Sequence, residues 1–540
     1  MLALWALIAA GLPARADEPH AFAVATADPL ATAAAEEILR AGGNAADAAV
    51  AAALVLGVVN PWNSGIGGGG FALVHRASDR ATTFLDFRET APAAATADMF
   101  VREGRAVPEL SRRGGLAVGV PGEVAGLAEI SRRFGKLGLA KAAAAAIRIA
   151  ERGYPAGPEI AEVFRGGPPA DGGLAQVFFH AGALLPTGAP IRNRPLAATL
   201  RAIAKRGPDA FYRGRIAKAI ATSVRAAGGI VTEADLAGYR TREAAPIRGT
   251  YRGHSVASAP LPSSGGLVLI EALAVLERFD LRAHGPGSAD HLHLVAEALK
   301  PGFADRAEFL GDTPVGRAAM VLLLAPSRLQ ARASRVRADR ALPASRWAEP
   351  REGPRDAGTT HLAVVDAEGN AVALSSTVNL GFGAHLTAAG TGVVLNDQMD
   401  DFAAQPGTAN AFGLVQSAEN AVGPGKRPLS SMSPTIVFDA AGAPVLVVGA
   451  AGGPRIISST LQVLVGVVDF RLSAAEALAL PRVHHQWMPD VLEMEPAVTN
   501  DACRALSALG HRIVRRERIG TAQAVARSPA GYAGAMDLRR

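Results

Sequence analysis

The residues with the clearest chemical potential are two threonines, Thr359 and Thr360, which follow Gly358 where a charged, proline-containing segment ends. A threonine hydroxyl is a weak nucleophile that needs a base, and no GxSxG-type motif stands out in the chain. A threonine at a chain terminus has its own base, because an α-amine has a pKa of about 7.7–8.0. Cleavage after Gly358 would therefore create a nucleophile at Thr359, and glycine leaves the scissile bond uncrowded.

Other residues could bind a substrate that has a carbonyl group to be attacked and, at its other end, a carboxylate and an ammonium group. The backbone N–H groups of Gly452 and Gly453 can approach an oxyanion closely, because glycine has no side chain. The guanidinium of Arg88 can hold a carboxylate with two hydrogen bonds, and the carboxylate of Asp401 can hold an ammonium group.

A predicted β-hairpin positions the first threonine. Residues 361–366 and 370–377 alternate and are rich in β-forming residues, and the turn between them ends in Gly369, where a positive φ is needed. Pairing Asp366 with Asn370 places Thr359 opposite Thr377, within a residue or so. Cross-strand threonines at this separation can form a hydrogen bond.

Two further predicted hairpins bring polar groups to their open ends. In the hairpin of residues 433–438 and 443–448, pairing Asp439 with Ala443 places Ser430 opposite Gly452. The hairpin of residues 71–75 and 82–87 brings Arg88 near a glycine run at residues 67–70. Polar residues at the open end of a single hairpin need no functional explanation, because Ser, Thr and Gly are common where strands end. The open ends of three hairpins, carrying hydroxyls, glycines and a charge that complement one another, indicate a shared site.

The rest of the chain divides into a helical part and a strand-rich part. Helices are predicted over residues 30–40, 45–59, 121–134, 140–153 and 289–310, the second capped by Asn44 and the last interrupted at Pro301 and Gly302. Residues 313–358 are rich in Arg, Ala and Pro, and are interpreted as largely a surface segment. Strands dominate from Thr359 onward.

Composition excludes several classes of protein. The chain has 540 residues, 49% hydrophobic and 19% charged, with a formal net charge of +6. No basic run interleaved with aromatics indicates a nucleic-acid surface. The lone Cys503 allows no intrachain disulfide and no cysteine-rich metal site.

The N-terminus predicts a signal peptide over residues 1–16, because an apolar run at residues 2–12 precedes Ala14-Arg15-Ala16. The protein is therefore expected to be exported to the periplasm or outside the cell, and no other segment is predicted to span a membrane.

Long motifs, in order along nearly the whole chain, resemble those of gamma-glutamyltranspeptidases. They are GGNAADAAVA (42–51), NSGIGGGGF (63–71), LDFRETAPA (85–93), VPGEVAGL (120–127), LPSSGG (261–266), AEALKPGFADRAEFLGD (296–312), TTHLAVVDAEGNAVALSSTVN (359–379), LNDQMDDF (395–402), GKRPLSSMSPTIV (425–437), GAAGGPRI (449–456) and PRVHHQWMPD (481–490).

The resemblance implies an α+β fold, the four-layer αββα sandwich of N-terminal-nucleophile hydrolases. It also implies a precursor that cleaves itself between Gly358 and Thr359. The two products, a helix-rich large subunit (residues 17–358, with an Arg-rich tail from about residue 313) and a strand-rich small subunit (residues 359–540), are expected to stay together.

The resemblance also assigns roles to residues. Thr359 matches the family's nucleophile, Thr377 the threonine that assists it, and Gly452 and Gly453 the oxyanion-hole pair. Arg88, Ser430 and Ser431 match the groups that hold the donor α-carboxylate, and Asn379, Gln398 and Asp401 those around the α-amino group. The implied reaction passes a γ-glutamyl group from glutathione-like donors through a Thr359 ester to water or to an amino-acid or peptide acceptor, with no metal or cofactor.

Three alternatives remain open. One is a cephalosporin or glutaryl acylase on the same scaffold, whose substrates lack the α-amino group that Asp401 and Gln398 match. Another is a transferase or depolymerase of poly-γ-glutamate. The third is an exported binding protein without catalysis, which the Thr359, Thr377 and Gly452 set disfavours. Residues 402–428 are either a lid, with Phe412 at its tip, or an ordinary surface loop.

Overall fold

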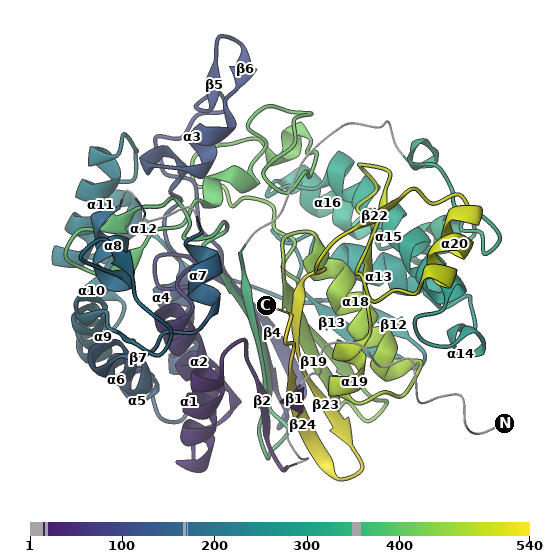
Figure 1. Cartoon of the computed structure of the whole chain (residues 1–540), viewed down its shortest axis with the longest axis horizontal. Coiled ribbons are helices and arrows are strands. Elements are labelled where there is room, and N and C mark those ends of the chain that lie inside the picture. Colours follow the sequence, from purple (N-terminus) through teal and green to yellow (C-terminus); the bar gives the residue numbers. More distant parts are fainter. Residues whose placement is uncertain (1–14, 17–19, 166–168, 170, 348–357, 540) are drawn as a thin grey trace.

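The computed structural model describes residues 15–16, 20–165, 169, 171–347 and 358–539 of the 540-residue chain. Within these ranges helices are combined with two large antiparallel sheets, which stand side by side in the middle of the molecule with helices to either side (Figure 1). This mixture confirms the predicted α+β class. No helix in the described ranges is both long and apolar enough to cross a bilayer.

The first sheet joins strands from both halves of the sequence. Its six strands, in spatial order, are β11 (Arg242–Ala244), β4 (Ala81–Phe87), β3 (Gly69–Arg76), β15 (Ala371–Thr377), β14 (Thr360–Val365) and β2 (Ala23–Ala25). β14 and β15 therefore lie between strands from the N-terminal part of the chain, so Thr359, just before β14, is surrounded by structure rather than placed at an edge.

The second sheet is built in the same antiparallel way. Its seven strands are β1 (Arg15–Ala16), β24 (Gly531–Met536), β23 (Thr521–Ser528), β19 (Pro444–Ala451), β18 (Thr435–Phe438), β13 (His254–Ser258) and β12 (Ile247–Tyr251). The predicted signal segment lies outside the described residues except for β1, which pairs with Ala535 and Met536.

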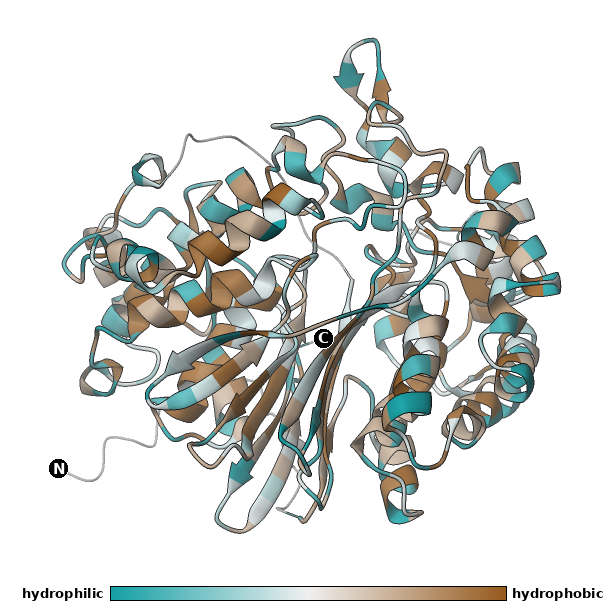
Figure 2. Ribbon diagram, turned by 180° about the vertical axis from the view of Figure 1, so that it is seen from behind, coloured by the Kyte–Doolittle hydropathy of each residue, from teal (hydrophilic) through white to brown (hydrophobic). Residues whose placement is uncertain are grey.

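Strand periodicity explains why the first sheet has two buried faces. Leu362 and Val364 of β14 belong to the core shared with the N-terminal helices, whereas Ala363 and Val365 belong to the core shared with the second sheet. Successive side chains of a strand point to opposite faces, so β14 has to be apolar throughout. Figure 2 shows this apolar colouring on the central strands.

Helices on the first sheet's side form one layer. They are α1 (Pro29–Arg40), α2 (Ala45–Val59), α4 (Glu123–Phe134), α5 (Leu139–Ala142), α6 (Ala144–Arg152), α9 (Arg194–Arg206), α10 (Asp209–Tyr212) and α11 (Arg215–Ala226), with the shorter α3 (Pro108–Arg112), α7 (Glu159–Val163), α8 (Gly172–Phe178) and α12 (Glu233–Gly238). The Ala-rich α2 is buried along its whole length. Asn44 and Asp47 form a capping box at its start, which confirms the predicted cap.

Helices on the second sheet's side form another layer. They are α13 (Gly265–Leu276), α14 (Leu281–His284), α15 (Ala289–Phe309), α16 (Pro314–Leu323), α17 (Pro326–Ala333), α18 (Arg455–Val468), α19 (Ala474–Ala479) and α20 (Asn500–Ala508). A small sheet of β20 (Val483–His484), β21 (Leu492–Met494) and β22 (Ile513–Arg515) lies on this side. Half-buried Cys503 lies beside Met494.

The remaining described elements are short. The strands are β5 (Val101–Arg102), β6 (Arg105–Ala106), β7 (Tyr154–Pro155), β8 (Phe179–His180), β9 (Ala183–Leu184), β10 (Pro190–Ile191), β16 (Thr387–Ala388) and β17 (Val393–Val394). The 3-10 turns are η1 (Gly115–Ala117), η2 (Ala344–Arg346), η3 (Gln398–Asp401) and η4 (Ala418–Asn420).

One sequence-based expectation about helices is wrong. The predicted break at Pro301 and Gly302 is absent, and α15 continues through both residues. A Cβ on Gly302 would lie 3.0 Å from Val268 Cα, so close packing against α13 holds the helix together across the proline. Most described residues of the segment after residue 313 are exposed or half-buried, as predicted for a surface segment. The segment also contains α16 and α17: Thr313 caps the first, and buried Asp305 forms ion pairs with Arg328 and Arg332 of the second. Residues 348–357 lie outside the described residues.

Candidate active site

The hairpin of β14 and β15 brings two threonine hydroxyls together. Thr360 pairs with Ser376, which confirms the predicted register and sets Thr359 opposite Thr377. The Oγ1 atoms of Thr359 and Thr377 are 3.2 Å apart, and both residues are buried.

The carbonyl group of Gly358 lies between these hydroxyls. Its oxygen accepts hydrogen bonds from Thr359 Oγ1 at 2.8 Å and from Thr377 Oγ1 at 3.0 Å. The backbone N–H of Asn379 donates to Thr377 Oγ1 at 2.9 Å, which orients that hydroxyl toward Gly358. Two O–H donors on one carbonyl oxygen polarise the peptide bond that precedes Thr359.

The surroundings of Gly358 leave little room for a side chain. A Cβ at this position would lie 3.1 Å from Asn379 O, 3.1 Å from Asn63 Oδ1 and 3.2 Å from Trp62 O. Such contacts are closer than nine in ten Cβ contacts in proteins, so Gly358 or these neighbours would have to shift by a few tenths of an ångström.

Gly358→Ala is therefore expected to slow cleavage after residue 358 about tenfold or more, because small displacements of reacting groups have effects of that order. The measurement is the fraction of uncut chain on a denaturing gel as a function of time after purification. Gly381→Ala is a matched control, since a Cβ there meets nothing within 4 Å. Cleavage of the Gly358→Ala chain at the wild-type rate would contradict this steric account.

Two glycines at the end of β19 present free backbone donors. Gly452 and Gly453 have φ values of 122° and 56°, and only Pro454, the N-cap residue, separates them from the start of α18. Within the described part of the chain neither N–H donates a hydrogen bond. Unpaired N–H groups at a helix N-terminus are suited to bind an anion. A Cβ on Gly453 would lie 2.6 Å from the Phe412 ring, so only glycine fits there.

The register of the second hairpin corrects one prediction. Phe438 pairs with Pro444, but a β-bulge shifts the following pairs by one residue, so Thr435 pairs with Val448. Ser430 is not paired with Gly452 and instead forms a bridge with Ser263. The predicted turn is confirmed, because Asp439 N donates to Ala443 O, but no residue pattern indicated the bulge.

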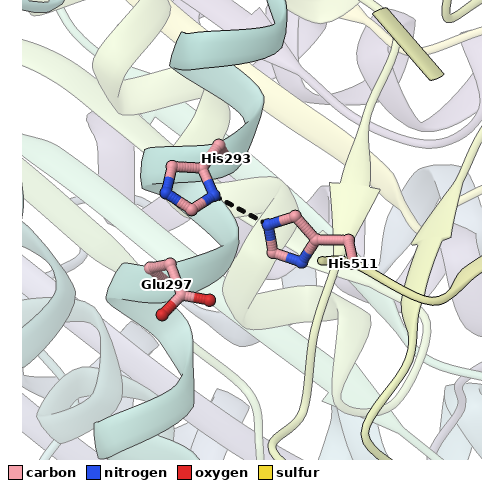
Figure 3. A group of neighbouring side chains, drawn as sticks. All are labelled: His293, Glu297 and His511. Carbon is pink, nitrogen blue, oxygen red and sulfur yellow. Dashed lines mark hydrogen bonds between the residues drawn. The ribbon is translucent and has the colours of Figure 1, made fainter. Parts of the chain in front are cut away.

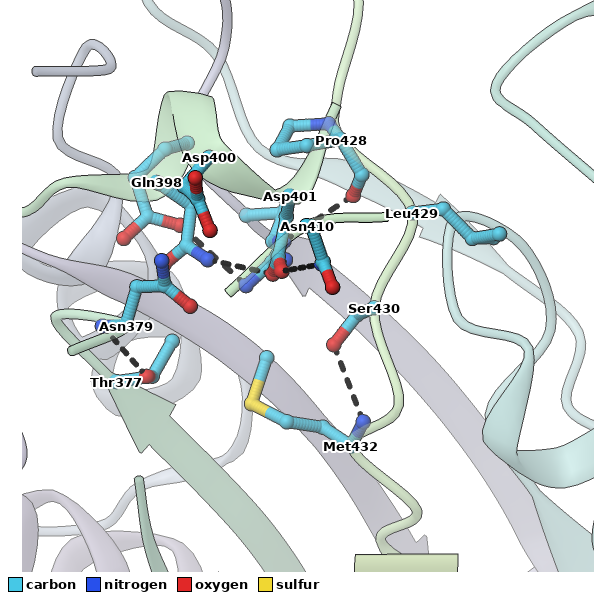
Figure 4. Close-up of polar contacts among 12 residues, drawn as sticks. Thr377, Asn379, Gln398, Asp400, Asp401, Asn410, Pro428, Leu429, Ser430 and Met432 are labelled. Atoms are coloured by element: carbon cyan, nitrogen blue, oxygen red, sulfur yellow. Dashed lines mark hydrogen bonds and ion pairs between the residues drawn. The ribbon is translucent and has the colours of Figure 1, made fainter. Parts of the chain in front are cut away.

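A charged cluster lies beyond the threonines. Arg88, which follows β4, forms an ion pair with Asp401 Oδ2 at 2.5 Å. Gln398 Nε2 donates to the same oxygen at 2.8 Å, and Asn410 Nδ2 donates to Asp401 Oδ1 at 3.2 Å. Figure 4 shows the Gln398 and Asn410 side chains converging on Asp401. Burial raises the pKa of Asp401, and the neighbouring Arg88 guanidinium acts against that rise.

The expected site residues line one small cavity. Its walls are Arg88, Thr359, Thr377, Asn379, Gln398, Asp401, Phe412, Ser430, Ser431, Met432, Gly453 and Ile456. The structure thus brings together every predicted site residue except Gly358 and Gly452. These two glycines line a second cavity, which Thr359 also lines. The Asn379 side chain donates to Asp397 O at 3.1 Å.

Phe412 and its loop close one side of this cavity. Phe412 is buried and contacts Gly453 through its ring. Asp400 Oδ2 accepts from Ala411 N at 2.9 Å, so the loop is hydrogen-bonded to the residue next to Asp401. This placement is what a lid requires, and the lid role stays a prediction.

Comparisons with known proteins agree on one family. The family model described as Gamma-glutamyltranspeptidase matches residues 31–540. The chain belongs to the gamma-glutamyltranspeptidase family. The glutathione hydrolase proenzyme of Escherichia coli is 41% identical over 96% of this chain and 90% of its own.

Solved structures include two kinds of relative. The cephalosporin acylase of Bacillus halodurans is 30% identical, with a TM-score of 0.84 over 98% of this chain and 96% of its own. The gamma-glutamyltranspeptidase of Helicobacter pylori is 37% identical, with a TM-score of 0.56 over 59% of this chain and 92% of its own. The overall fold therefore does not separate a gamma-glutamyltranspeptidase from an acylase, and the site has to do so.

Several supporting residues of this gamma-glutamyltranspeptidase family member were missed by sequence reasoning. Gln416 Nε2 and Asn420 Nδ2 both donate to the backbone oxygen of Asp401, at 3.0 and 2.7 Å. Behind Ser430, Ser264 Oγ donates to its carbonyl oxygen at 2.7 Å, and Arg306 Nε donates to Ser264 Oγ at 3.1 Å. The LPSSGG motif was a signal for Ser264, whereas nothing in the sequence singled out Gln416 or Asn420.

A buried carboxyl group lies behind the sheet that carries Thr377. Glu123, the first residue of α4, is 1% exposed, and burial raises its pKa to about 8. Its pKa in an unfolded chain is about 4.3. The folded protein therefore keeps a proton that the unfolded chain loses, so the stability contribution is full below about pH 4.3 and is lost as pH rises toward 8.

Glu123→Gln is expected to remove this pH dependence, because the amide does not titrate. The Tm of the variant relative to wild type should rise by several degrees between pH 5 and pH 8, measured by thermal unfolding at both values. The exposed Glu517→Gln is the control and should show no such trend. A Tm difference that stays flat over this range would contradict the assignment.

A second buried cluster, His293 and Glu297 of α15 with His511, has residue types that bind metals (Figure 3). His293 Nε2 lies 2.8 Å from Arg337 O, so this nitrogen carries the proton, and His293 Nδ1 accepts from His511 Nε2 at 2.8 Å. Glu297 is already ion-paired with Lys300 at 2.6 Å. Because the Lys300 ammonium group already pairs with the Glu297 carboxylate, we interpret the cluster as a structural link between α15 and the C-terminal region and not as a metal site.

Proposed function

We propose that this protein is a self-processing gamma-glutamyltransferase and glutathione hydrolase with Thr359 as its nucleophile. The observation that carries the proposal is the Arg88–Asp401–Gln398 cluster in the same small cavity as Thr359. A γ-glutamyl donor has an α-carboxylate and an α-ammonium group at the end remote from the bond that breaks. Arg88 matches the first of these groups, and Asp401 matches the second.

The first reaction is cleavage of the chain itself. Thr359 Oγ1 attacks the Gly358 carbonyl carbon, the bond to Thr359 N breaks, and that nitrogen takes the hydroxyl proton. Thr377 Oγ1, donating to Gly358 O at 3.0 Å, stabilises the charge that develops on this oxygen. Water then hydrolyses the resulting ester, which leaves a Gly358 carboxylate and a free Thr359 with its own amine.

The second reaction uses the new terminus. The Thr359 α-amine accepts the hydroxyl proton while Oγ1 attacks the donor's γ-carbonyl carbon. The free N–H groups of Gly452 and Gly453 bind the oxyanion. The amine of the donor leaves with the proton, and the γ-glutamyl group remains as an ester on Thr359. Arg88, Ser430 and Ser431 hold the α-carboxylate.

The proposal includes the processed assembly. Residues 17–358 and 359–540 are the large and small subunits, and the two stacked sheets with helices outside are the αββα sandwich of N-terminal-nucleophile hydrolases. In the first sheet the small-subunit strands β15 and β14 lie between the large-subunit strands β3 and β2, which supports the two subunits staying together after the cut. We further propose export directed by residues 1–16, Phe412 as the tip of a lid, and a reaction that uses no metal or cofactor.

The cephalosporin acylase with high structural similarity makes glutaryl amide hydrolysis the second candidate. Steady-state kcat/KM on a γ-glutamyl anilide and on the matching glutaryl anilide separates the two, because only the first carries an α-amino group. We expect the γ-glutamyl compound to be preferred by about 100-fold or more, the effect of losing a buried charge partner. Faster hydrolysis of the glutaryl compound would refute the proposal.

A further inference from the structure

Helix α16 carries large apolar side chains that point away from the protein. Four large hydrophobic residues are exposed in the described part of the chain, and three of them lie on this ten-residue helix. Val315, Val321 and Leu322 are 62%, 72% and 68% exposed. The fourth, Leu30 near the start of α1, is 36% exposed. Single exposed apolar residues are common, whereas several on one helix indicate an interaction surface.

The helix is apolar on both of its faces. Gly316, Met320 and Leu323 are buried, and their spacing of four and three residues places them on the face that packs against the protein. Val315 and Leu322 are seven residues apart, about two turns, and lie together on the opposite face. A surface helix is normally polar on that face. Packing within this chain therefore does not explain the exposed apolar side chains.

Arginines flank this exposed apolar face, and their acidic partners are buried. Asp312, just before α16, pairs with Arg317 at 2.9 Å and with Arg242 at 2.8 Å. The Asp312 side chain is 4% exposed, whereas the two arginines are 55% and 47% exposed. Fully buried Asp305 is likewise shared by two arginines of α17. Because each carboxylate is shared by two guanidinium groups, each cluster presents an excess of positive charge.

The sequence around α16 has the same sign of charge. Residues 313–347 contain seven arginines, one aspartate and no other charged residue, a net charge of +6. Two acids beside the helix oppose this charge. Glu308, on the last turn of α15, is exposed, and half-buried Glu419 accepts a hydrogen bond from Thr313 at the start of α16. The arginines outnumber these acids, so the surface favours an anionic partner.

The charge and the side-chain types distinguish between partners. A second copy of the chain, related by a two-fold axis at α16, would bring the same arginines together, and their repulsion would oppose association. Protein interfaces also depend mainly on Trp, Tyr and Arg packed in pockets, whereas the exposed side chains of α16 are aliphatic. Aliphatic side chains flanked by arginines suit an anionic phospholipid surface, because they enter the acyl region while guanidinium groups contact the headgroup phosphates.

We propose that α16 docks this protein on anionic phospholipid bilayers, lying in the plane of the interface with Val315, Val321 and Leu322 inserted. Binding is reversible and sensitive to salt, because only three large side chains insert and the remaining attraction is electrostatic. No residue of α16 lines either cavity at Thr359. Docking therefore goes beyond the proposed enzymatic function and does not depend on it.

The test measures co-sedimentation of the processed protein with vesicles of equal parts phosphatidylglycerol and phosphatidylcholine, compared with phosphatidylcholine alone. Protein that begins at residue 17, checked by mass spectrometry, is used because the apolar residues 2–12 would themselves bind lipid. The partition coefficient is expected to be about tenfold or more higher for the anionic vesicles. Raising NaCl from about 0.1 M to about 0.5 M should release most of the bound protein.

Two variants separate the apolar and the charged contributions. Val321→Asp combined with Leu322→Asp should lower the partition coefficient about tenfold or more, because both side chains leave the acyl region. Arg317→Glu should weaken binding to the anionic vesicles about fivefold or more. The matched controls lie on α1, where Leu30→Asp replaces an exposed leucine and Arg40→Glu an exposed arginine that also has an acidic partner. Both controls should bind as wild type does, and an unchanged Tm of each variant shows that it folds.

Several results would overturn docking through α16. They are no binding to the anionic vesicles, equal binding to both kinds of vesicle, or wild-type binding by the Val321→Asp and Leu322→Asp double variant. Equal losses in the α1 controls would also overturn it. A dimer in sedimentation velocity that the double variant abolishes would assign the exposed face to a second copy of the chain instead. Failure of the proposed enzymatic function is distinguishable, since it would appear as lack of γ-glutamyl hydrolysis with vesicle binding unchanged.

Discussion

Thr359→Ala protein is expected to run as one uncut chain of about 55 kDa on a denaturing gel and to have no measurable activity. The hydroxyl is required twice, first to attack the Gly358 carbonyl and then to attack the donor. Loss of a nucleophile typically lowers kcat by about four orders of magnitude or more. The remaining geometry should persist, because Thr377 still donates to Gly358 O.

Thr359→Ser is the matched variant, since it keeps a hydroxyl at the same atom. It should cleave and hydrolyse a γ-glutamyl anilide at a reduced rate. Thr360→Ala tests the neighbouring threonine, whose Oγ1 has no hydrogen-bond partner among the described residues, and should still be cut. A single-chain Thr359→Ala protein with activity would require a different nucleophile.

Asp401→Asn should separate cleavage of the chain from use of the donor. The substitution removes the charge that pairs with Arg88 and that is assigned to the donor ammonium group. Removing one partner of a buried charge pair costs about 2–5 kcal/mol, so kcat/KM for a γ-glutamyl anilide should fall about 30-fold or more. Cleavage after Gly358 should continue, because among the described residues the Gly358 oxygen accepts from Thr359 and Thr377, and neither hydroxyl contacts Asp401 through a hydrogen bond.

The control for this variant is Asp439→Asn, which removes a carboxylate from an ion pair with Arg527 at the turn of the second hairpin. It should leave both reactions unchanged. The glutaryl anilide provides a second check, because it has no ammonium group and should not lose rate in Asp401→Asn. Equal losses on both anilides would mean that Asp401 acts through the fold of the site and not through the donor.

Local rules predicted the part of the site that a single hairpin builds. The Asp366-to-Asn370 turn is closed by hydrogen bonds from Asn370 to Asp366, and this fixes the register that sets Thr359 beside Thr377. Turn chemistry and strand alternation are short-range properties, so the sequence carries them directly. The position of Arg88 just after β4 was predicted in the same way, from the hairpin of residues 71–75 and 82–87.

Contacts between distant segments could not be predicted from the residues alone. The bulge between Val437 and Phe438 shifted the second hairpin by one residue, although its turn was recognised. Asn410 reaches Asp401 from a loop without periodic pattern, and α15 passes through Pro301 because α13 packs against Gly302. The roles of Ser430 and Gly453 came from the family resemblance, because the hairpin register that placed Ser430 opposite Gly452 was wrong.

Thr359 is proposed to become the N-terminus of the smaller piece and to carry the γ-glutamyl ester. Mass spectrometry of wild-type protein, acid-quenched during turnover of a γ-glutamyl donor, can locate both the terminus and the ester. We expect a piece comprising residues 359–540, with the added mass of one γ-glutamyl group on the peptide that begins at Thr359. An uncut active chain, a different terminus, or the added mass on another residue would contradict it.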